Sequence, residues 1–127
     1  MKWILKTRLF VRWMRKASLQ DDALRTAIEE MERGLVDADL GGGVFKKRIA
    51  LSGRGKRGGA RTLIATNREN RWIFVFGFEK NDRENITQAE LAFLQGIARD
   101  LLECSESALK AAIDKGELQE VRYESNH

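Results

Sequence analysis

The segment Arg71–Phe78 constrains the fold most, because it is apolar on both faces of an extended chain. Successive side chains of a β-strand point to opposite faces. This alternation predicts one face with four aromatic side chains and another with two branched ones: Trp72, Phe74, Phe76 and Phe78 on the first, Ile73 and Val75 on the second. A strand that is apolar on both faces belongs in the middle of a sheet rather than at its edge.

Two more segments of strand length precede this one, Val44–Ala50 and Ala60–Thr66. The polar run Asn67–Asn70 predicts a hairpin turn that leads into Arg71–Phe78. A short strand is expected over Lys2–Lys6 as well. We therefore expect these strands to form a small, mainly antiparallel sheet.

Helical patterns flank the strands on both sides. On the N-terminal side, Thr7 and Ser18 are the predicted N-caps of two helices, and Gly34 is the predicted stop of the second. Asp21, three residues after Ser18, resembles the acidic partner in a capping box. Each helix carries an apolar stripe. In the first helix the stripe is formed by Phe10, Trp13, Met14 and Ala17, and Arg8, Arg12 and Arg15 lie outside it.

On the C-terminal side, Thr87 and Glu90 have the spacing of a capping box. Ser105 is expected to cap a further short helix that stops at Gly116. The segment Leu118–Val121 is compatible with a last short strand or with a docked tail. The order of helices, strands and helices predicts an α+β fold, with N-terminal helices packed on the antiparallel sheet and C-terminal helices after it.

Length and composition limit the class of protein. The 127 residues are enough for one domain, expected to span residues 1–127. Cys104 is the one cysteine, which excludes internal disulfides and cysteine-rich zinc sites and fits a reducing cytoplasm. No apolar run reaches the roughly 20 residues of a membrane span, and no secretory signal is evident. We expect a cytoplasmic protein without a membrane segment.

Positive charge is concentrated in the centre of the chain. Residues 44–72 contain nine basic residues and one acidic residue, a net charge of +8, whereas the whole chain has +4. The sequence G-R-G-K-R-G at 53–58 matches a dinucleotide fingerprint only in letters, because a strand rather than a helix is expected after it. The segment is better interpreted as a cationic loop for phosphates, with candidate RNA-binding residues Arg54, Lys56 and Arg57. A charge run of this kind can also be only a solvated face.

The strand Val44–Ala50 adds further cations. If Phe45 and Ile49 point into the core, Lys46 and Arg48 share the opposite face. Antiparallel pairing could bring Arg61, at the start of the next strand, to the same surface. Residues after the third strand continue the group: Lys80, Arg83 and Asn85. The alternative for Lys80 and Arg83 is ion pairing with acids close by in the sequence.

Three runs resemble the RelE/HigB superfamily of toxins from type II toxin–antitoxin modules. They are DLGGGVFKKRIA at 39–50, GRGKRGGARTL at 53–63 and FGFEKNDRENI at 76–86. The similarity extends over residues 9–121. It implies a bacterial endoribonuclease that cleaves messenger RNA, often on the ribosome, with a fold like that of microbial ribonucleases. It also implies a cognate antitoxin, expected to be a helix-turn-helix protein.

The resemblance also implies site residues. Lys46 and Arg48 correspond to the paired basic residues of the family's first central strand, Arg61 to the arginine that opens the next strand, and Lys80 or Arg83 to the arginine past the third. These five are the catalytic candidates. Lys47 and Asn85 join the three loop cations as candidate RNA-binding residues. The family's usual tyrosine near the last helix has no match, because Tyr123 is the one tyrosine of the chain.

The expected chemistry is internal transesterification of RNA, which requires a proton acceptor, cations at the phosphate and a proton for the leaving oxygen. Clustered cations disfavour the charged form of a lysine, so Lys46 is the expected acceptor. The one histidine, His127, is the last residue and is not expected to take part. Neither a metal nor another cofactor is expected. A nucleic-acid-binding protein without catalysis, or a gyrase-targeting toxin like ParE, is the alternative function.

Overall fold

One mixed sheet organises the molecule. The computed structural model describes residues 1–51 and 55–122, with only the backbone described for 55–58. The sheet has the strand order β2-β3-β4-β5-β1-β6. Its strands are β1 (Trp3–Thr7), β2 (Ala38–Gly41), β3 (Val44–Leu51), β4 (Gly55–Thr66), β5 (Arg71–Glu79) and β6 (Leu118–Glu120). Neighbouring strands are antiparallel except for β1 and β5, which run parallel.

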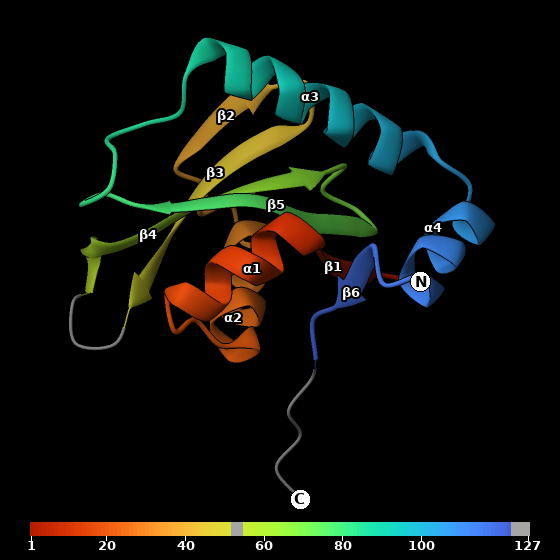
Figure 1. Ribbon diagram of the computed structural model, residues 1–127, viewed down its shortest axis with the longest axis horizontal. Coiled ribbons are helices and arrows are strands. Elements are labelled where there is room, and N and C mark those ends of the chain that lie inside the picture. Colours follow the sequence, from red (N-terminus) through yellow and green to blue (C-terminus); the bar gives the residue numbers. More distant parts are fainter. Residues whose placement is uncertain (52–54, 123–127) are drawn as a thin grey trace, which may run out of the picture.

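Helices cover both faces of the sheet. They are α1 (Arg8–Lys16), α2 (Asp21–Glu32), α3 (Gln88–Glu103) and α4 (Glu106–Asp114). Figure 1 shows α1 and α2 on one side of the sheet and α3 across the other side. Two apolar cores result, one around Phe10, Leu24 and Phe74 and the other around Leu63 and Leu94. The predicted α+β fold, with N-terminal helices on the sheet and C-terminal helices after it, is confirmed.

Strand β5 is central, as its two apolar faces predict, because it lies between β4 and β1. Its alternation is nevertheless interrupted by a β-bulge. Leu63 pairs with Phe76, but the next residue of β4, Ile64, pairs with Phe74, so Val75 is the extra residue. The prediction of a single aromatic face is therefore wrong beyond Val75.

The bulge exchanges the faces of the second half of β5. Trp72 and Phe74 belong to the core under α1 and α2, whereas Phe76 packs with the core under α3. Phe78 follows Phe76, and the two rings lie 6.3 Å apart. Gly77 thus lies on the face of α1, where an added Cβ would be 2.3 Å from the ring of Trp13. The absence of a side chain at Gly77 lets the indole ring lie directly on the strand.

Most of the helix N-caps are the residues that the sequence predicts. Thr7 and Ser105 each accept a hydrogen bond as N-caps, and Thr87 with Glu90 forms the predicted capping box. The predicted cap at Ser18 is wrong. Helix α2 begins at Asp21 after Gln20, which has no side-chain capping bond. Ser18 instead has a φ of 56°, the left-handed conformation that commonly follows a helix end.

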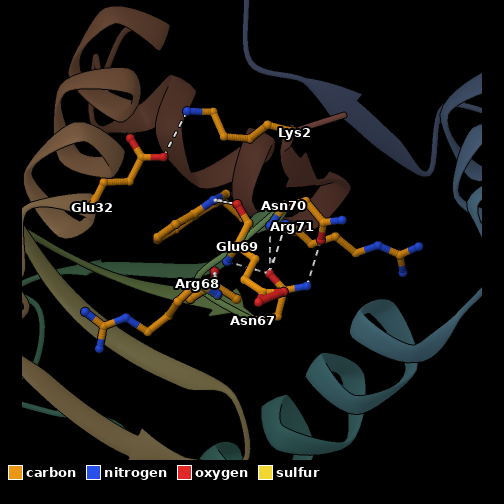
Figure 2. A network of polar contacts seen from close by, with 9 residues as sticks. Lys2, Glu32, Asn67, Arg68, Glu69, Asn70 and Arg71 are labelled. Atoms are coloured by element: carbon orange, nitrogen blue, oxygen red, sulfur yellow. Dashed lines mark hydrogen bonds and ion pairs between the residues drawn. The ribbon is translucent and has the colours of Figure 1, made fainter.

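The hairpin turn between β4 and β5 is held mainly by the side chain of Asn67 (Figure 2), and the Oγ1 atom of Thr66 accepts the main-chain N–H of Arg68 at 2.7 Å. The Oδ1 atom of Asn67 accepts hydrogen bonds from the main-chain N–H groups of Glu69, Asn70 and Arg71, at 2.9, 3.0 and 3.1 Å. Arg68 takes a φ of 62° in this turn. The turn predicted from the polar run Asn67–Asn70 is confirmed and fixes the register of the two central strands.

Strand β2 was not expected from the sequence. It has only four residues and pairs with β3 through a register shift. Gly42 and Gly43 connect the two strands with φ values of 63° and 82°. The segment Leu118–Val121 was compatible with a short strand or a docked tail. It contains a strand, β6, which pairs with β1.

Candidate functional site

Cationic side chains gather on the sheet face that carries α3. Arg48 of β3 pairs in register with Arg61 of β4, which in turn pairs with Phe78 of β5. Two residues along, Lys46 pairs with Leu63, which is part of the core under α3. Because residues in register share a face, Lys46, Arg48 and Arg61 lie on one surface, as predicted. We call these three residues the cationic sheet cluster.

Lys46 and Arg48 differ in their partners. Lys46 is half-buried and has no hydrogen-bond or ion-pair partner within residues 1–51 and 55–122. Arg48 is exposed, and its Nε atom lies 4.0 Å from Oδ1 of Asp37. The other carboxylate oxygen of Asp37 accepts the main-chain N–H of Arg48 at 2.7 Å. The sequence reasoning missed this acid because it precedes β2, eleven residues before Arg48.

Arg61 is the most enclosed member of the cationic sheet cluster. Only 6% of the residue is exposed, and its Nη1 atom donates to the carbonyl of Gly59 at 3.5 Å. Burial of a guanidinium is costly unless its N–H groups are hydrogen-bonded. The enclosed position restricts the orientation of Arg61 beside Arg48 and Phe78.

The segment after β5 contributes the remaining predicted residues. Lys80 is exposed and has no ion pair within the described part of the chain. Arg83 pairs with Glu90, and its guanidinium lies 5.9 Å from the centre of the Phe76 ring. The ion-pair partner of Arg83 is thus an acid on α3 rather than one in the segment next to it. Asn85 is exposed, and its Oδ1 accepts the main-chain N–H of Ile86 at 2.9 Å.

Lys47 is placed differently from the prediction. Its side chain is only 4% exposed and its Nζ atom lies 2.8 Å from Oε1 of Glu30 on α2. Alternation along β3 turns it to the face of Phe45 and Ile49, under the N-terminal helices. The structure contradicts the prediction that Lys47 lies on the RNA-binding surface. Its positive charge is used to pair a glutamate at a helix–sheet interface.

The three cations of the central loop cannot be added to this surface. Arg54 lies outside the described residues, and so do the side chains of Lys56 and Arg57. The prediction of a loop is wrong over residues 55–58, because their backbone belongs to β4, which begins at Gly55 rather than at Ala60. Within the described residues, no three His, Cys, Asp or Glu side chains are grouped in a way that could hold a metal ion. The helices of that part are also too short or too polar to cross a membrane.

The fold and this surface define a class of small α+β protein that gathers cations on one face of its sheet. A comparison with models of protein families identifies the family of this chain. The family model of the RelE toxin of the RelE/RelB toxin–antitoxin system matches residues 1–121. The chain belongs to this family and is a RelE-family toxin of a type II toxin–antitoxin system. No curated protein matches the chain.

Proposed function

We propose that this toxin is an endoribonuclease that inhibits translation by cleaving messenger RNA, in a reaction that needs no metal. Two observations support the proposal, the family of the chain and the cationic sheet cluster. The cationic sheet cluster carries the proposal, because Arg48 and Arg61 are in register on adjacent strands and Lys46 lies on the same face. Such a surface can hold one phosphodiester between two guanidinium groups.

The reaction is an internal transesterification. The ribose 2′-oxygen forms a bond to the adjacent phosphorus, the bond from phosphorus to the 5′-oxygen breaks, and a 2′,3′-cyclic phosphate and a 5′-hydroxyl result. Lys46 accepts the proton of the 2′-hydroxyl. Arg48 and Arg61 stabilise the charge on the pentacoordinate phosphate. A cation after β5 supplies a proton to the 5′-oxygen.

Lys80 is the better candidate for that last role. Arg83 donates an N–H to Glu90 and packs on Phe76, so one side of its guanidinium is already occupied. Lys80 follows the last residue of β5, Glu79, which pairs with Ala60 beside Arg61. We therefore assign Arg83 to RNA positioning, together with Asn85, and Arg54, Lys56 and Arg57 stay candidate RNA-binding residues from the sequence.

The RelB antitoxin named with this family is the proposed protein partner. We propose that it covers the cationic sheet cluster or blocks its approach to the ribosome. That the antitoxin of this chain has a helix-turn-helix fold stays a prediction. Messenger RNA on ribosomes is the proposed substrate, which assigns the function to the cytoplasm.

A reconstituted translation reaction tests this function. Purified toxin added to translating ribosomes should shorten the message and leave 5′-hydroxyl ends. Lys46→Ala should abolish cleavage, whereas Lys110→Ala, on the exposed side of α4, should leave it unchanged. Intact message with ribosome binding would favour binding without catalysis, and damaged DNA with gyrase present would favour the ParE-like alternative. Either result would overturn the proposal.

A further inference from the structure

The acid Asp37 lies against the cationic sheet cluster. It directly precedes β2, the strand at one end of the sheet, which pairs with β3. Its main-chain N–H donates to the carbonyl of Lys46 at 3.1 Å, and its Oδ2 atom accepts the main-chain N–H of Arg48 at 2.7 Å. Asp37 therefore brackets the stretch of β3 that carries two residues of the cluster.

The carboxylate of Asp37 takes the place of a neighbouring strand. Strand β2 begins at Ala38, which pairs with Lys46, so the main-chain N–H of Arg48 lies beyond the start of β2. A backbone N–H at such an edge needs another acceptor, which here is Oδ2 of Asp37. Because this bond and the main-chain bond to Lys46 both hold Asp37, its second carboxylate oxygen has a restricted position beside the side chain of Arg48.

The second oxygen of Asp37 is close to the inner nitrogen of the Arg48 guanidinium. The distance from Oδ1 to Nε is 4.0 Å, and 46% of the Arg48 side chain is exposed. Within residues 1–51 and 55–122, the two outer nitrogens of Arg48 form no hydrogen bond or ion pair. A guanidinium held from the side of Nε keeps its outer N–H groups for bidentate contacts with a phosphate.

The place of Asp37 in the sheet keeps it away from the phosphate site. Arg48 and Arg61 face each other across β3 and β4, and like charges directly opposite each other destabilise a sheet. Strand β2 lies on the other side of β3 from β4, as the strand order shows (Figure 1). Asp37 therefore offsets the charge of Arg48 without occupying the space between the two guanidinium groups.

We propose that Asp37 is a positioning residue, which orients Arg48 so that its outer N–H groups face the phosphate that it shares with Arg61. This inference rests on the proposed function, because it concerns a residue that acts on the same site. Asp37 acts through Arg48 and does not touch the reacting atoms. An exposed ion pair contributes little to stability, so the effect of the charge is on the orientation of Arg48 and not on the fold.

Asp37→Asn tests the inference, because an asparagine still accepts the main-chain N–H of Arg48 but carries no charge. The matched control is Asp39→Asn, which removes the same charge two residues further along the chain, in β2. The carboxylate of Asp39 accepts the main-chain N–H of Gly41 at 2.9 Å and has no ion pair within the described part of the chain. The two variants thus differ in whether the lost charge faces Arg48.

The rate of cleavage of ribosome-bound message is measured against ribosome concentration. Asp37→Asn should lower the rate at saturation by about tenfold, since a misplaced guanidinium stabilises the transition state less well. It should not raise the ribosome concentration for half-maximal rate, because the loss of an acid does not weaken the attraction to RNA. Asp39→Asn should keep the wild-type rate. An equal rate for the two variants would overturn the inference.

Coupling to Arg48 separates a positioning role from a structural one. In the Arg48→Met background, Asp37→Asn should cause no further loss of rate, because residues that act through one contact are not additive. Losses that multiply would overturn the inference. A rate that falls only in proportion to the folded fraction, as given by thermal melts, would assign Asp37 to the scaffold and would also overturn it.

The mobility of the Arg48 Nε–H group, measured by NMR relaxation, tests the inference without cleavage. Asp37→Asn should make this group more mobile, and Asp39→Asn should leave it as it is in the wild type. Absence of cleavage by the wild type together with this result would overturn the proposed function and still support the orientation of Arg48 by Asp37. Equal mobility in the two variants would overturn the inference even if the wild type cleaves the message.

Discussion

Arg83 Nη1 lies 2.6 Å from Glu90 Oε1, and the same oxygen accepts the main-chain N–H of Thr87 at 2.8 Å. The ion pair therefore ties the segment after β5 to the capping box that begins α3. The hydrogen bond from Arg83, followed by the backbone hydrogen bond from Thr87, lowers the pKa of Glu90 from 4.5 to about 2. The pKa of Arg83 is raised, mainly by the hydrogen bond to Glu90.

The first prediction concerns the pH dependence of stability at Glu90. A carboxylate whose pKa is lowered by folding stabilises the fold above its unfolded value of about 4.5, and the effect disappears as the pH falls through about 2. Glu90→Gln should melt at a lower temperature than the wild type at pH 7. The difference should narrow between about pH 4.5 and 2, as measured by thermal melts in low salt.

The control for this experiment is Glu84→Gln. Glu84 is exposed and has no ion pair in the described part of the chain. The melting temperature of the Glu84→Gln variant should follow that of the wild type across the same pH range. A difference in melting temperature between Glu90→Gln and the wild type that stays constant down to pH 2 would contradict the role assigned to the ion pair.

The second prediction separates two neighbouring lysines. Lys47→Gln should lower the free energy of unfolding by about 1–3 kcal/mol, because Glu30 loses a buried partner. Lys46→Gln should leave stability within about 0.5 kcal/mol and weaken the binding of RNA, with a shallower salt dependence. Urea unfolding and ribosome binding in increasing salt measure the two effects. A large loss of RNA affinity in stable Lys47→Gln would return Lys47 to the binding surface.

Alternation of side chains was sufficient to predict the long central strands but not the bulge. The sequence alternates through Trp72–Phe78 without a break, so nothing local marks Val75 as the extra residue. The bulge is set by the register of β5 with β4, and the packing of Trp13 against Gly77 accompanies it, a contact between segments far apart in the chain. As a result, Phe76 and Phe78 lie beside the candidate site rather than under α1.

The placement of a site residue could be predicted where alternation along a single strand determines it. It could not be predicted where the partner of the residue belongs to another element. Alternation places Lys46 and Arg48 together, and the same rule applied to Lys47 would have excluded it. The acids Asp37 and Glu90 were missed because contacts between different elements select them.

The third prediction uses two glycines with different surroundings. Gly77→Ala should destabilise the protein by about 1–3 kcal/mol, because the added methyl group overlaps the Trp13 ring. Gly96→Ala, inside α3, meets only the end of Arg99 at 4.0 Å and should stabilise by up to about 1 kcal/mol. Urea unfolding of both variants provides the measurement. Similar stability of Gly77→Ala and wild type would contradict the close packing of Trp13 on β5.

The last prediction concerns Arg61, whose burial makes truncation to alanine ambiguous. With only 6% of the residue exposed, Arg61→Ala would remove packing as well as charge. Arg61→Met keeps most of the side-chain volume without the cation, and Arg61→Lys keeps the charge without the bidentate geometry. If Arg61 stabilises the phosphate in the transition state, Arg61→Met should slow cleavage by about 10²–10³ and restore cell growth, with Arg61→Lys between it and the wild type. Melting temperature, cleavage rate and growth are measured together for the three proteins. A folded Arg61→Met that remains fully toxic would remove Arg61 from the mechanism, and losses of activity that merely follow the folded fraction would assign it to the scaffold.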